Sequence, residues 1–152
     1  MLGGDTPEED VEAIRNWFAT WSGYVAAVNF SAARQLFDEG AVGFGTWMTM
    51  VEGLEALERE QWRAIWPTIE DFRFVLESLK VTVSGDRCMA VALLHFDSTG
   101  IAEDGARFPR PGRVTVVLGR KDPAQPWLGV HTHLSLNRGV PQQSHGQRPE
   151  TT

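Results

Sequence analysis

The sequence predicts an α+β domain in which three N-terminal helices pack on one strongly curved antiparallel sheet. Two observations point to this class. Segments with the apolar spacing of helices dominate residues 7–66, and long segments with strand character follow over residues 71–137. Helices gathered before a run of strands, instead of alternating with them, are typical of a sheet that helices cover on one face. Long strands with bulges curl, so we expect a hollow between the sheet and the helices.

The first helix is predicted to begin at Pro7. Thr6 is a suitable N-cap, proline is favoured at the first helical position, and Glu9 can complete a capping box with Thr6. Apolar residues then recur at the spacing of one helical stripe, at Val11, Ile14, Phe18, Trp21, Val25 and Val28. This stripe predicts a long amphipathic helix with one face covered by the rest of the domain.

Two further helices are expected before the long strands. Ser31 can cap a short helix over residues 32–38, and Gly40 ends it. From Gly53 the spacing is helical again until Pro67, which forbids continuation. One side of this third helix carries Leu54, Leu57, Gln61, Trp62, Ile65 and Trp66. Two tryptophans are therefore expected to point inward from a single helix.

The remaining segments are predicted to be extended. Residues 41–51 lack helical spacing and contain two glycines, so two short extended pieces are expected there. Four longer strands follow over residues 71–83, 87–98, 113–120 and 127–137, separated by turns that contain Gly, Pro, Asp and Ser. We expect these four strands to form an antiparallel meander.

Length, charge and cysteine content limit the classes of protein that fit this chain. Its 152 residues suffice for one core, predicted over residues 1–137, with residues 138–152 as a flexible polar tail. A net charge of −6 argues against binding to nucleic acid or a membrane surface, because both need clustered Lys and Arg. No segment approaches the roughly 18 apolar residues of a membrane-spanning helix. A single cysteine, Cys88, fits a reducing compartment, so we expect a cytoplasmic protein.

The order of elements and several short sequence segments resemble the nuclear transport factor 2-like superfamily, specifically its SnoaL-like branch. These segments are FDEGAVGFGT before the helix that begins after Gly53, GRVTVVLGRKD in a later strand, and WLGVHTHLS in the last strand. The resemblance implies a cone-shaped fold with a cavity, and commonly a homodimer formed through the outer face of the sheet. The superfamily includes isomerases, epoxide hydrolases, cyclases, dehydratases and the oligomerising hub of a calmodulin-dependent kinase.

The catalytic carboxylates of ketosteroid isomerase, a member of that superfamily, have no counterpart in this sequence. The resemblance places the isomerase's base at Phe44 and its oxyanion partner among Thr115, Val116 and Val117. Because neither position carries a carboxylate, we do not expect that particular proton transfer here.

His95 and Asp97 are the predicted acid-base residues. Side chains alternate along a strand, so both lie on one side together with Leu93, and the resemblance to the kinase hub turns that side toward the cavity. An imidazole and a carboxylate two residues apart can act on one ligand and tune each other's protonation. The structural alternative is a hydrogen-bonded pair at the cavity mouth or at a subunit contact.

His131 and His133 are predicted to face away from the cavity. The opposite side of their strand is apolar, and buried strands turn their apolar set toward the core. Arg113 and Ser135 share the outer side, so we expect these four residues to form a dimer interface or an alternative site. The two imidazoles do not predict a metal site, because the segment after them supplies no third His or carboxylate.

Aromatic residues in the segments expected to cover the cavity indicate the kind of ligand. Six Trp is a high number for 152 residues, and such side chains bind flat apolar molecules well. The residues predicted to contact a small hydrophobic molecule are Trp17, Trp21, Tyr24, Phe44, Trp47, Trp62, Trp66, Leu93, Val116 and Thr132. Two hypotheses follow, both without a metal or cofactor. The chain is an isomerase, cyclase or dehydratase, or it is a noncatalytic module for ligand binding or oligomerisation.

Overall fold

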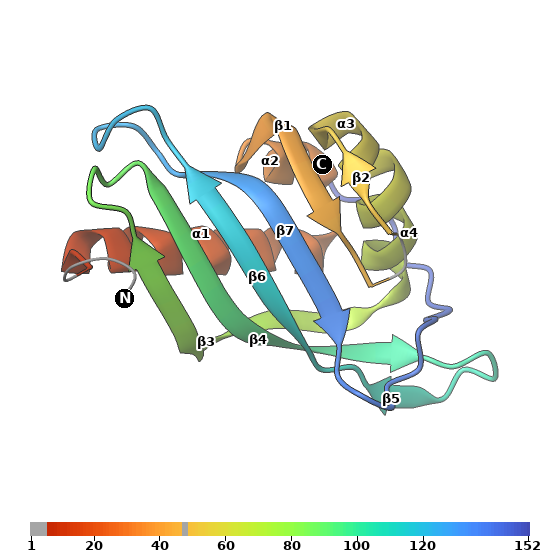
Figure 1. Ribbon diagram of the computed structural model, residues 1–152. Helices are drawn as coiled ribbons and strands as arrows, with labels where there is room; N and C mark the ends of the chain where they lie inside the picture. The colour runs from red at the N-terminus through yellow and green to blue at the C-terminus, as the bar shows by residue number, and fades with distance from the viewer. Residues whose placement is uncertain (1–5, 47–48) are drawn as a thin grey trace.

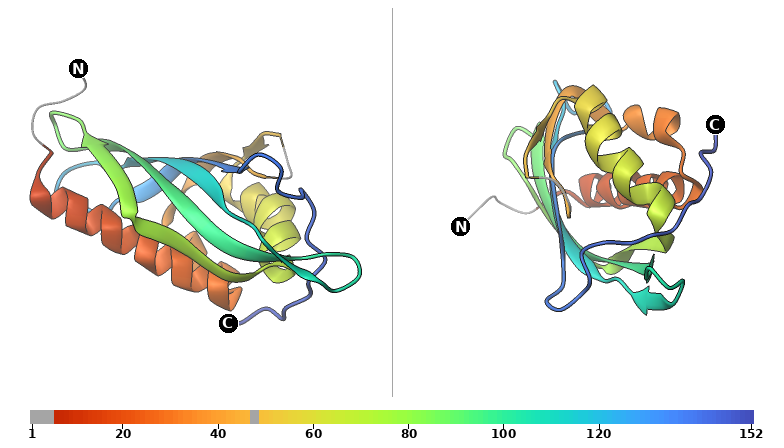
Figure 2. Two further views of the ribbon diagram at one scale, coloured as in Figure 1. Left: turned by 90° about the horizontal axis from the view of Figure 1, so that it is seen from below. Right: turned by 90° about the vertical axis from the view of Figure 1, so that its right-hand side faces the viewer.

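The helices lie on one face of a single curved sheet (Figure 1 and Figure 2). The computed structural model describes residues 6–46 and 49–152. Within these residues, seven strands form a mixed sheet in which six follow the order β2-β1-β7-β6-β4-β3, and β5 pairs with β4. The predicted α+β class, with three helical segments against a curved sheet, is confirmed.

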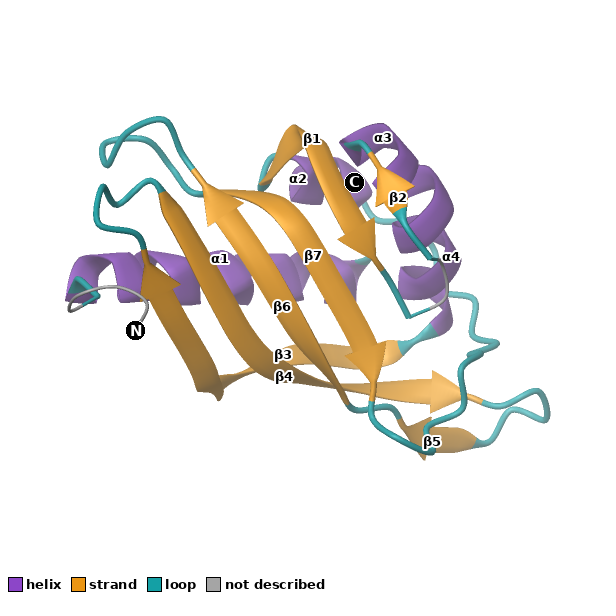
Figure 3. Cartoon of the chain, viewed as in Figure 1, coloured by secondary structure: helices purple, strands orange, loops and turns teal. Residues whose placement is uncertain are grey.

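Three helical segments cover the sheet (Figure 3). Their bounds are α1 (Glu8–Ala27), α2 (Phe30–Arg34), and a continuous third segment made of α3 (Leu54–Ala56), η1 (Leu57–Trp62), α4 (Arg63–Ile65) and η2 (Trp66–Thr68). The part named η1 is a π-helical turn, in which each hydrogen bond spans one residue more than in an α-helix. The predicted inward side of the third segment is largely buried, including both of its tryptophans.

The helix ends differ from the predicted caps. Thr6 makes no capping hydrogen bond, and α1 starts after Pro7 instead of at it. Asn29, not Ser31, caps α2, because the Asn29 side chain accepts a hydrogen bond from the Ala32 N–H at 3.2 Å. The predicted extension of α2 to residue 38 is wrong, since Phe37 begins a strand and buries its ring among the tryptophans of the core.

The four long strands match the predicted ranges closely, whereas β1 begins before the predicted extended segment and β5 lies in a predicted loop. The strand bounds are β1 (Phe37–Phe44), β2 (Val51–Glu52), β3 (Glu70–Val83), β4 (Met89–Ile101), β5 (Arg107–Pro109), β6 (Gly112–Gly119) and β7 (Leu128–Leu136). The prediction of a wholly antiparallel sheet is wrong, because β1 pairs with β7 in parallel. No hairpin joins these two strands, so nothing local forces their directions to oppose.

The core lies between α1 and the inner face of the sheet. Phe18 of α1 packs edge-on against Phe74 of β3, with ring centres 5.1 Å apart. The inner side of β4 is formed by four buried apolar residues, namely Ala90, Ala92, Leu94 and Phe96. None of the described helices is long and apolar enough to span a membrane.

Residues 138–152 run along the third helical segment and end near α2 (Figure 2). The Arg148 guanidinium donates to the carbonyl oxygens of Trp66, Ile69 and Ala26, and the Thr151 N–H donates to another carbonyl at 3.0 Å. These hydrogen bonds connect the tail to α1 and to the residues at the end of the third helical segment.

Candidate ligand-binding site

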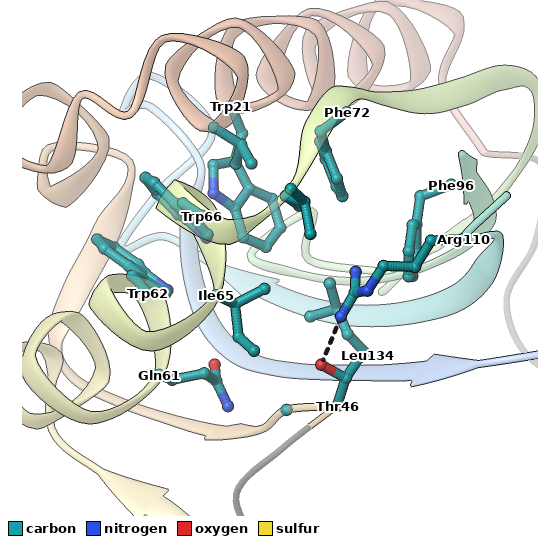
Figure 4. Close-up of a pocket in the computed structure, with 13 residues that line it drawn as sticks. Trp21, Thr46, Gln61, Trp62, Ile65, Trp66, Phe72, Phe96, Arg110 and Leu134 are labelled. Carbon is teal, nitrogen blue, oxygen red and sulfur yellow. Dashed lines mark hydrogen bonds between the residues drawn. The ribbon is translucent and has the colours of Figure 1, made fainter. Parts of the chain in front are cut away.

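A small pocket lies between the third helical segment and the inner face of the sheet (Figure 4). Its volume is about 40 Å³, which is room for about three water molecules. Five aromatic rings line it, from Trp21, Trp62, Trp66, Phe72 and Phe96. Trp62 and Trp66 stack with ring centres 4.8 Å apart and planes tilted by 17°. The half-buried lining residues Gly45, Thr46, Ile65 and Leu134 mark the side on which the pocket meets solvent.

Arg110 brings a buried positive charge to this pocket. The residue is only 2% exposed, and its Nη2 donates to the Thr46 hydroxyl at 3.1 Å, while its Nε has no acceptor among the described residues. Burial lowers the pKa of the guanidinium to about 10, so the group is still protonated at neutral pH. Ser98 fixes the backbone here, because it accepts from the Arg110 N–H at 2.8 Å and donates from its hydroxyl to the Arg110 carbonyl at 2.7 Å.

Two more polar groups in the pocket have no partner within the described residues. They are the Gln61 amide nitrogen and the Trp21 indole nitrogen. Gln61 comes from the π-helical turn, and its amide lies so close to Gly45 that a Cβ on that glycine would overlap it. The pocket therefore combines aromatic walls with several donors, of which Arg110 Nη2 has an acceptor in the Thr46 hydroxyl.

His95 and Leu93 do not face this pocket, so their predicted direction is wrong. Both lie on the outer face of β4, where Leu93 is 47% exposed. The inner face takes the alternate residues of β4 because these are the ones that pack on the helices. Asp97 is also at the surface, where its carboxylate pairs with Arg73 Nη2 at 3.2 Å. His95 and Asp97 therefore have no access to a ligand in the pocket.

The other predicted ligand contacts divide into four groups. Trp21, Trp62 and Trp66 line the pocket, and Trp47 lies outside the described residues. Four more are buried or half-buried without lining it, namely Trp17, Tyr24, Val116 and Thr132. Phe44 lies on the outer face, edge-on to His131 and His133 at 5.2 and 5.1 Å between ring centres, so its predicted cavity position is wrong.

The outer face of the sheet carries a broad open depression of about 620 Å³. Leu93, His95, Arg113, His133 and Ser135 are among its lining residues. Arg113 Nε donates to the Ser135 hydroxyl at 3.0 Å. Within the described ranges, no group of three or more His, Cys, Asp or Glu side chains is close enough to hold a metal ion.

The His131 imidazole lies against β1. One ring nitrogen, Nδ1, lies 2.8 Å from the Val42 carbonyl oxygen, within hydrogen-bonding distance. His131 is half-buried, whereas His133 is exposed. The two imidazoles thus lie on the same face of the sheet but differ in their exposure to solvent.

Three polar residues of the pocket, Thr46, Gln61 and Arg110, are absent from the predicted site. Gln61 had a visible signal, because it is a polar residue on the apolar stripe of a helix. Arg110 lies between two prolines in a loop, where no periodicity indicates a direction. Its inward orientation depends on the turn between β5 and β6.

The sequence of the folded domain matches a known family over most of its length. Residues 14–138 match the SnoaL-like domain. This chain belongs to the SnoaL-like domain family. The resemblance to the SnoaL-like branch of the nuclear transport factor 2-like superfamily is thereby confirmed. No curated protein matches the sequence.

Solved structures with the same fold belong to proteins of different kinds. A nuclear transport factor 2-like superfamily protein from Salmonella enterica superposes with a TM-score of 0.71 at 19% identity, over 89% of this chain and 97% of that one. A ketosteroid isomerase-like protein from Erwinia carotovora atroseptica gives 0.71 at 16% identity, over 89% and 100%. The association domain of CaMKII from C. elegans gives 0.65 at 16% identity, over 87% and 99%. At these identities the likeness establishes the SnoaL-like domain's fold and leaves its activity open.

Proposed function

We propose that this SnoaL-like domain binds a small molecule in the aromatic pocket and holds it without acid-base catalysis. The observation that carries the proposal is an aromatic-walled pocket whose lining includes buried donors without acceptors among the described residues, namely Gln61 Nε2 and Arg110 Nε. An unsatisfied buried donor costs about 1–3 kcal/mol. A molecule that accepts hydrogen bonds from these donors and packs an apolar surface against the rings gains binding free energy from both contacts.

The chemistry of the lining favours binding over catalysis. Among the described lining residues, Arg110 is the only ionisable side chain. Acid-base catalysis needs a group that gains and loses a proton near the working pH, and a guanidinium with a pKa of about 10 stays protonated there. His95 and Asp97, the alternative acid-base residues, lie on the outer surface of the sheet.

The size of the pocket limits the ligand. The enclosed 40 Å³ accommodates a polar group of about three heavy atoms, comparable to three waters. A larger apolar part has to extend toward the half-buried side formed by Gly45, Ile65 and Leu134.

Binding in the pocket is tested with the neutral probe phenylacetamide and nuclear magnetic resonance. The probe should shift the indole N–H resonances of Trp21 and Trp66 but not that of Trp127, which does not line the pocket. Ile65→Trp fills the open side of the pocket and should abolish the shifts, whereas Ala64→Trp, on the exposed adjacent position, should leave them intact. Unchanged shifts in Ile65→Trp, or no shifts in the parent protein, would mean that the pocket is not the binding site.

We propose a second role for the outer face, which is self-association through the sheet. Three of the four exposed large hydrophobic residues in the described chain lie on the outer side of β4, namely Met89, Val91 and Leu93. Exposed apolar clusters of this kind are typical of interaction sites, and a two-fold dimer brings the same patch of each copy together. The fourth exposed residue, Met50, lies elsewhere and provides a control.

The dimer proposal is tested by sedimentation. The parent protein and Met50→Asp should sediment as dimers, and Leu93→Asp as a monomer, because a carboxylate on β4 would be desolvated at the interface. A monomeric parent protein, or a dimeric Leu93→Asp, contradicts this role of the sheet.

A further inference from the structure

The Arg110 guanidinium is a buried cation without a counter-charge in the described part of the chain. Its one hydrogen-bonding partner there is the neutral Thr46 hydroxyl. Other buried arginines of this protein are paired differently, as Arg120 shows, since its guanidinium binds the Asp10 carboxylate at 2.9 Å. Burying an unpaired charge is costly, so a fold that keeps Arg110 in this position does so at the expense of stability.

The position of Arg110 is defined by its backbone. Both backbone polar groups of Arg110 are bonded to Ser98 on β4, and prolines flank the residue on either side. The side chain then extends into the pocket toward Thr46 (Figure 4). A rigid backbone with a free guanidinium at the end of the side chain is the arrangement expected of a preorganised binding group.

The charge and the space together select the chemistry of the partner. The described lining offers one cation and no second positive charge, which matches a singly charged anion better than a doubly charged phosphate. A carboxylate has three heavy atoms, comparable to the three waters that the enclosed volume accommodates. Its planar pair of oxygens also suits the parallel N–H groups of a guanidinium.

We propose that the pocket binds a monocarboxylic acid, with the carboxylate on Arg110 and the apolar remainder against the tryptophan side chains. This inference rests on the proposed function, because it names the class of ligand for the same pocket. Thr46, which follows β1, and Gln61 of the third helical segment supply further donors to the acid group. Burial lowers the pKa of Arg110, and a carboxylate beside the guanidinium would offset that effect by stabilising the charged form.

The proposal is tested by comparing phenylacetate with phenylacetamide, which differ only in the charge and donor pattern of the head group. The parent protein at neutral pH should bind the acid about tenfold or more tightly than the amide, as expected for a hydrogen-bonded charge pair in a buried site. Arg110→Met should remove this preference. Arg107→Met, which changes an exposed arginine paired with Glu70, should keep it.

The melting temperature of the ligand-free variant separates a binding role from a structural one. Methionine retains the apolar stem and removes the unpaired charge, so Arg110→Met should melt at or above the parent temperature. A fall of about 5 °C or more would show that Arg110 stabilises the fold, and would overturn its assignment as a binding group.

The outcomes distinguish the two proposals. Shifts of the tryptophan resonances by both probes, with equal affinities, would overturn the carboxylate assignment and leave binding in the pocket standing. No shifts with either probe would overturn both. Preference for the acid that persists in Arg110→Met would assign the anion to another site and also overturn the inference.

Discussion

Replacing Asp10 with asparagine tests the ion-pair network that joins the first turn of α1 to the sheet. The Asp10 carboxylate is 2% exposed, and it accepts hydrogen bonds from Arg87 Nε at 2.8 Å and from Arg120 Nη2 at 2.9 Å. Arg120 is also buried, and its guanidinium carbon lies 3.8 Å from the centre of the Trp127 ring. Asparagine keeps the shape of the side chain but removes the charge that faces both guanidinium groups.

The expected loss of stability follows from this burial. Removing one partner of a buried ion pair costs about 3–5 kcal/mol. We take the lower end, about 3 kcal/mol, because Arg87 is about one-third exposed and water screens its share of the interaction. In a domain of this size each kcal/mol corresponds to about 2–4 °C, so Asp10→Asn should melt about 6–12 °C below the parent protein.

The effect of Asp10→Asn should depend on pH in a defined direction. The hydrogen bond from Arg87, with a further contribution from Arg120 and against the effect of burial, lowers the pKa of Asp10 below its ordinary value of 3.8. A carboxyl with a lowered pKa stabilises the fold above its unfolded-state pKa, and this contribution is lost as pH falls through the folded-state pKa. The difference in melting temperature should therefore stay constant between about pH 8 and 5 and shrink below about pH 4.

Thermal unfolding followed by circular dichroism over this pH range measures both effects. Glu9→Gln is the matched control, because Glu9 contacts the same Arg87 from an exposed position, and it should melt within about 2 °C of the parent protein. The reasoning is refuted if Asp10→Asn melts as close to the parent at pH 7, or if its full deficit persists at pH 3.

Two further predictions concern the tail and the packing of the strands. Arg148→Met removes the donors that hold residues 138–152 to four backbone carbonyls. It should lower the free energy of unfolding by about 1–3 kcal/mol and speed hydrogen exchange at the Thr151 amide; unchanged exchange would mean that other contacts hold the tail. Gly112→Ala places a Cβ against the Phe96 ring and a backbone oxygen of β7, so it should cost about 1–3 kcal/mol in urea unfolding. Gly85→Ala, with open space around the glycine, should cost much less, and equal losses would contradict this packing argument.

Local patterns were sufficient for the fold class because they depend on periodicity alone. The stripe on α1 and the inward tryptophans of the third helical segment were predicted from spacing, and these residues are buried except for Val11, which is half-buried. Errors of the sequence interpretation concentrate at element ends. At Phe37, burial of the ring in the core outweighs the local preference for helix, which no cap signal could reveal.

The side of a strand that faces the core was predictable from the side that carries the apolar residues. Thr132 and Leu136 of β7 are buried, and His133 on the other side is exposed, as that rule predicts. For β4 the resemblance to another protein was used instead, and His95 was assigned to the wrong side. The apolar residues that alternate with His95 indicate the side of β4 that faces the core.

The sequence by itself determined the class of fold, the order of its main elements and the inward aromatic residues, because these are encoded in local spacing and composition, and its resemblance to known sequences indicated the family. Only the tertiary structure decided the parallel pairing of β1 with β7 and the composition of the pocket. Gly45 follows β1, Gln61 lies in the third helical segment, and Arg110 lies between β5 and β6. Their convergence depends on how the sheet curves and on how a proline-flanked turn directs one side chain, and no local pattern encodes either.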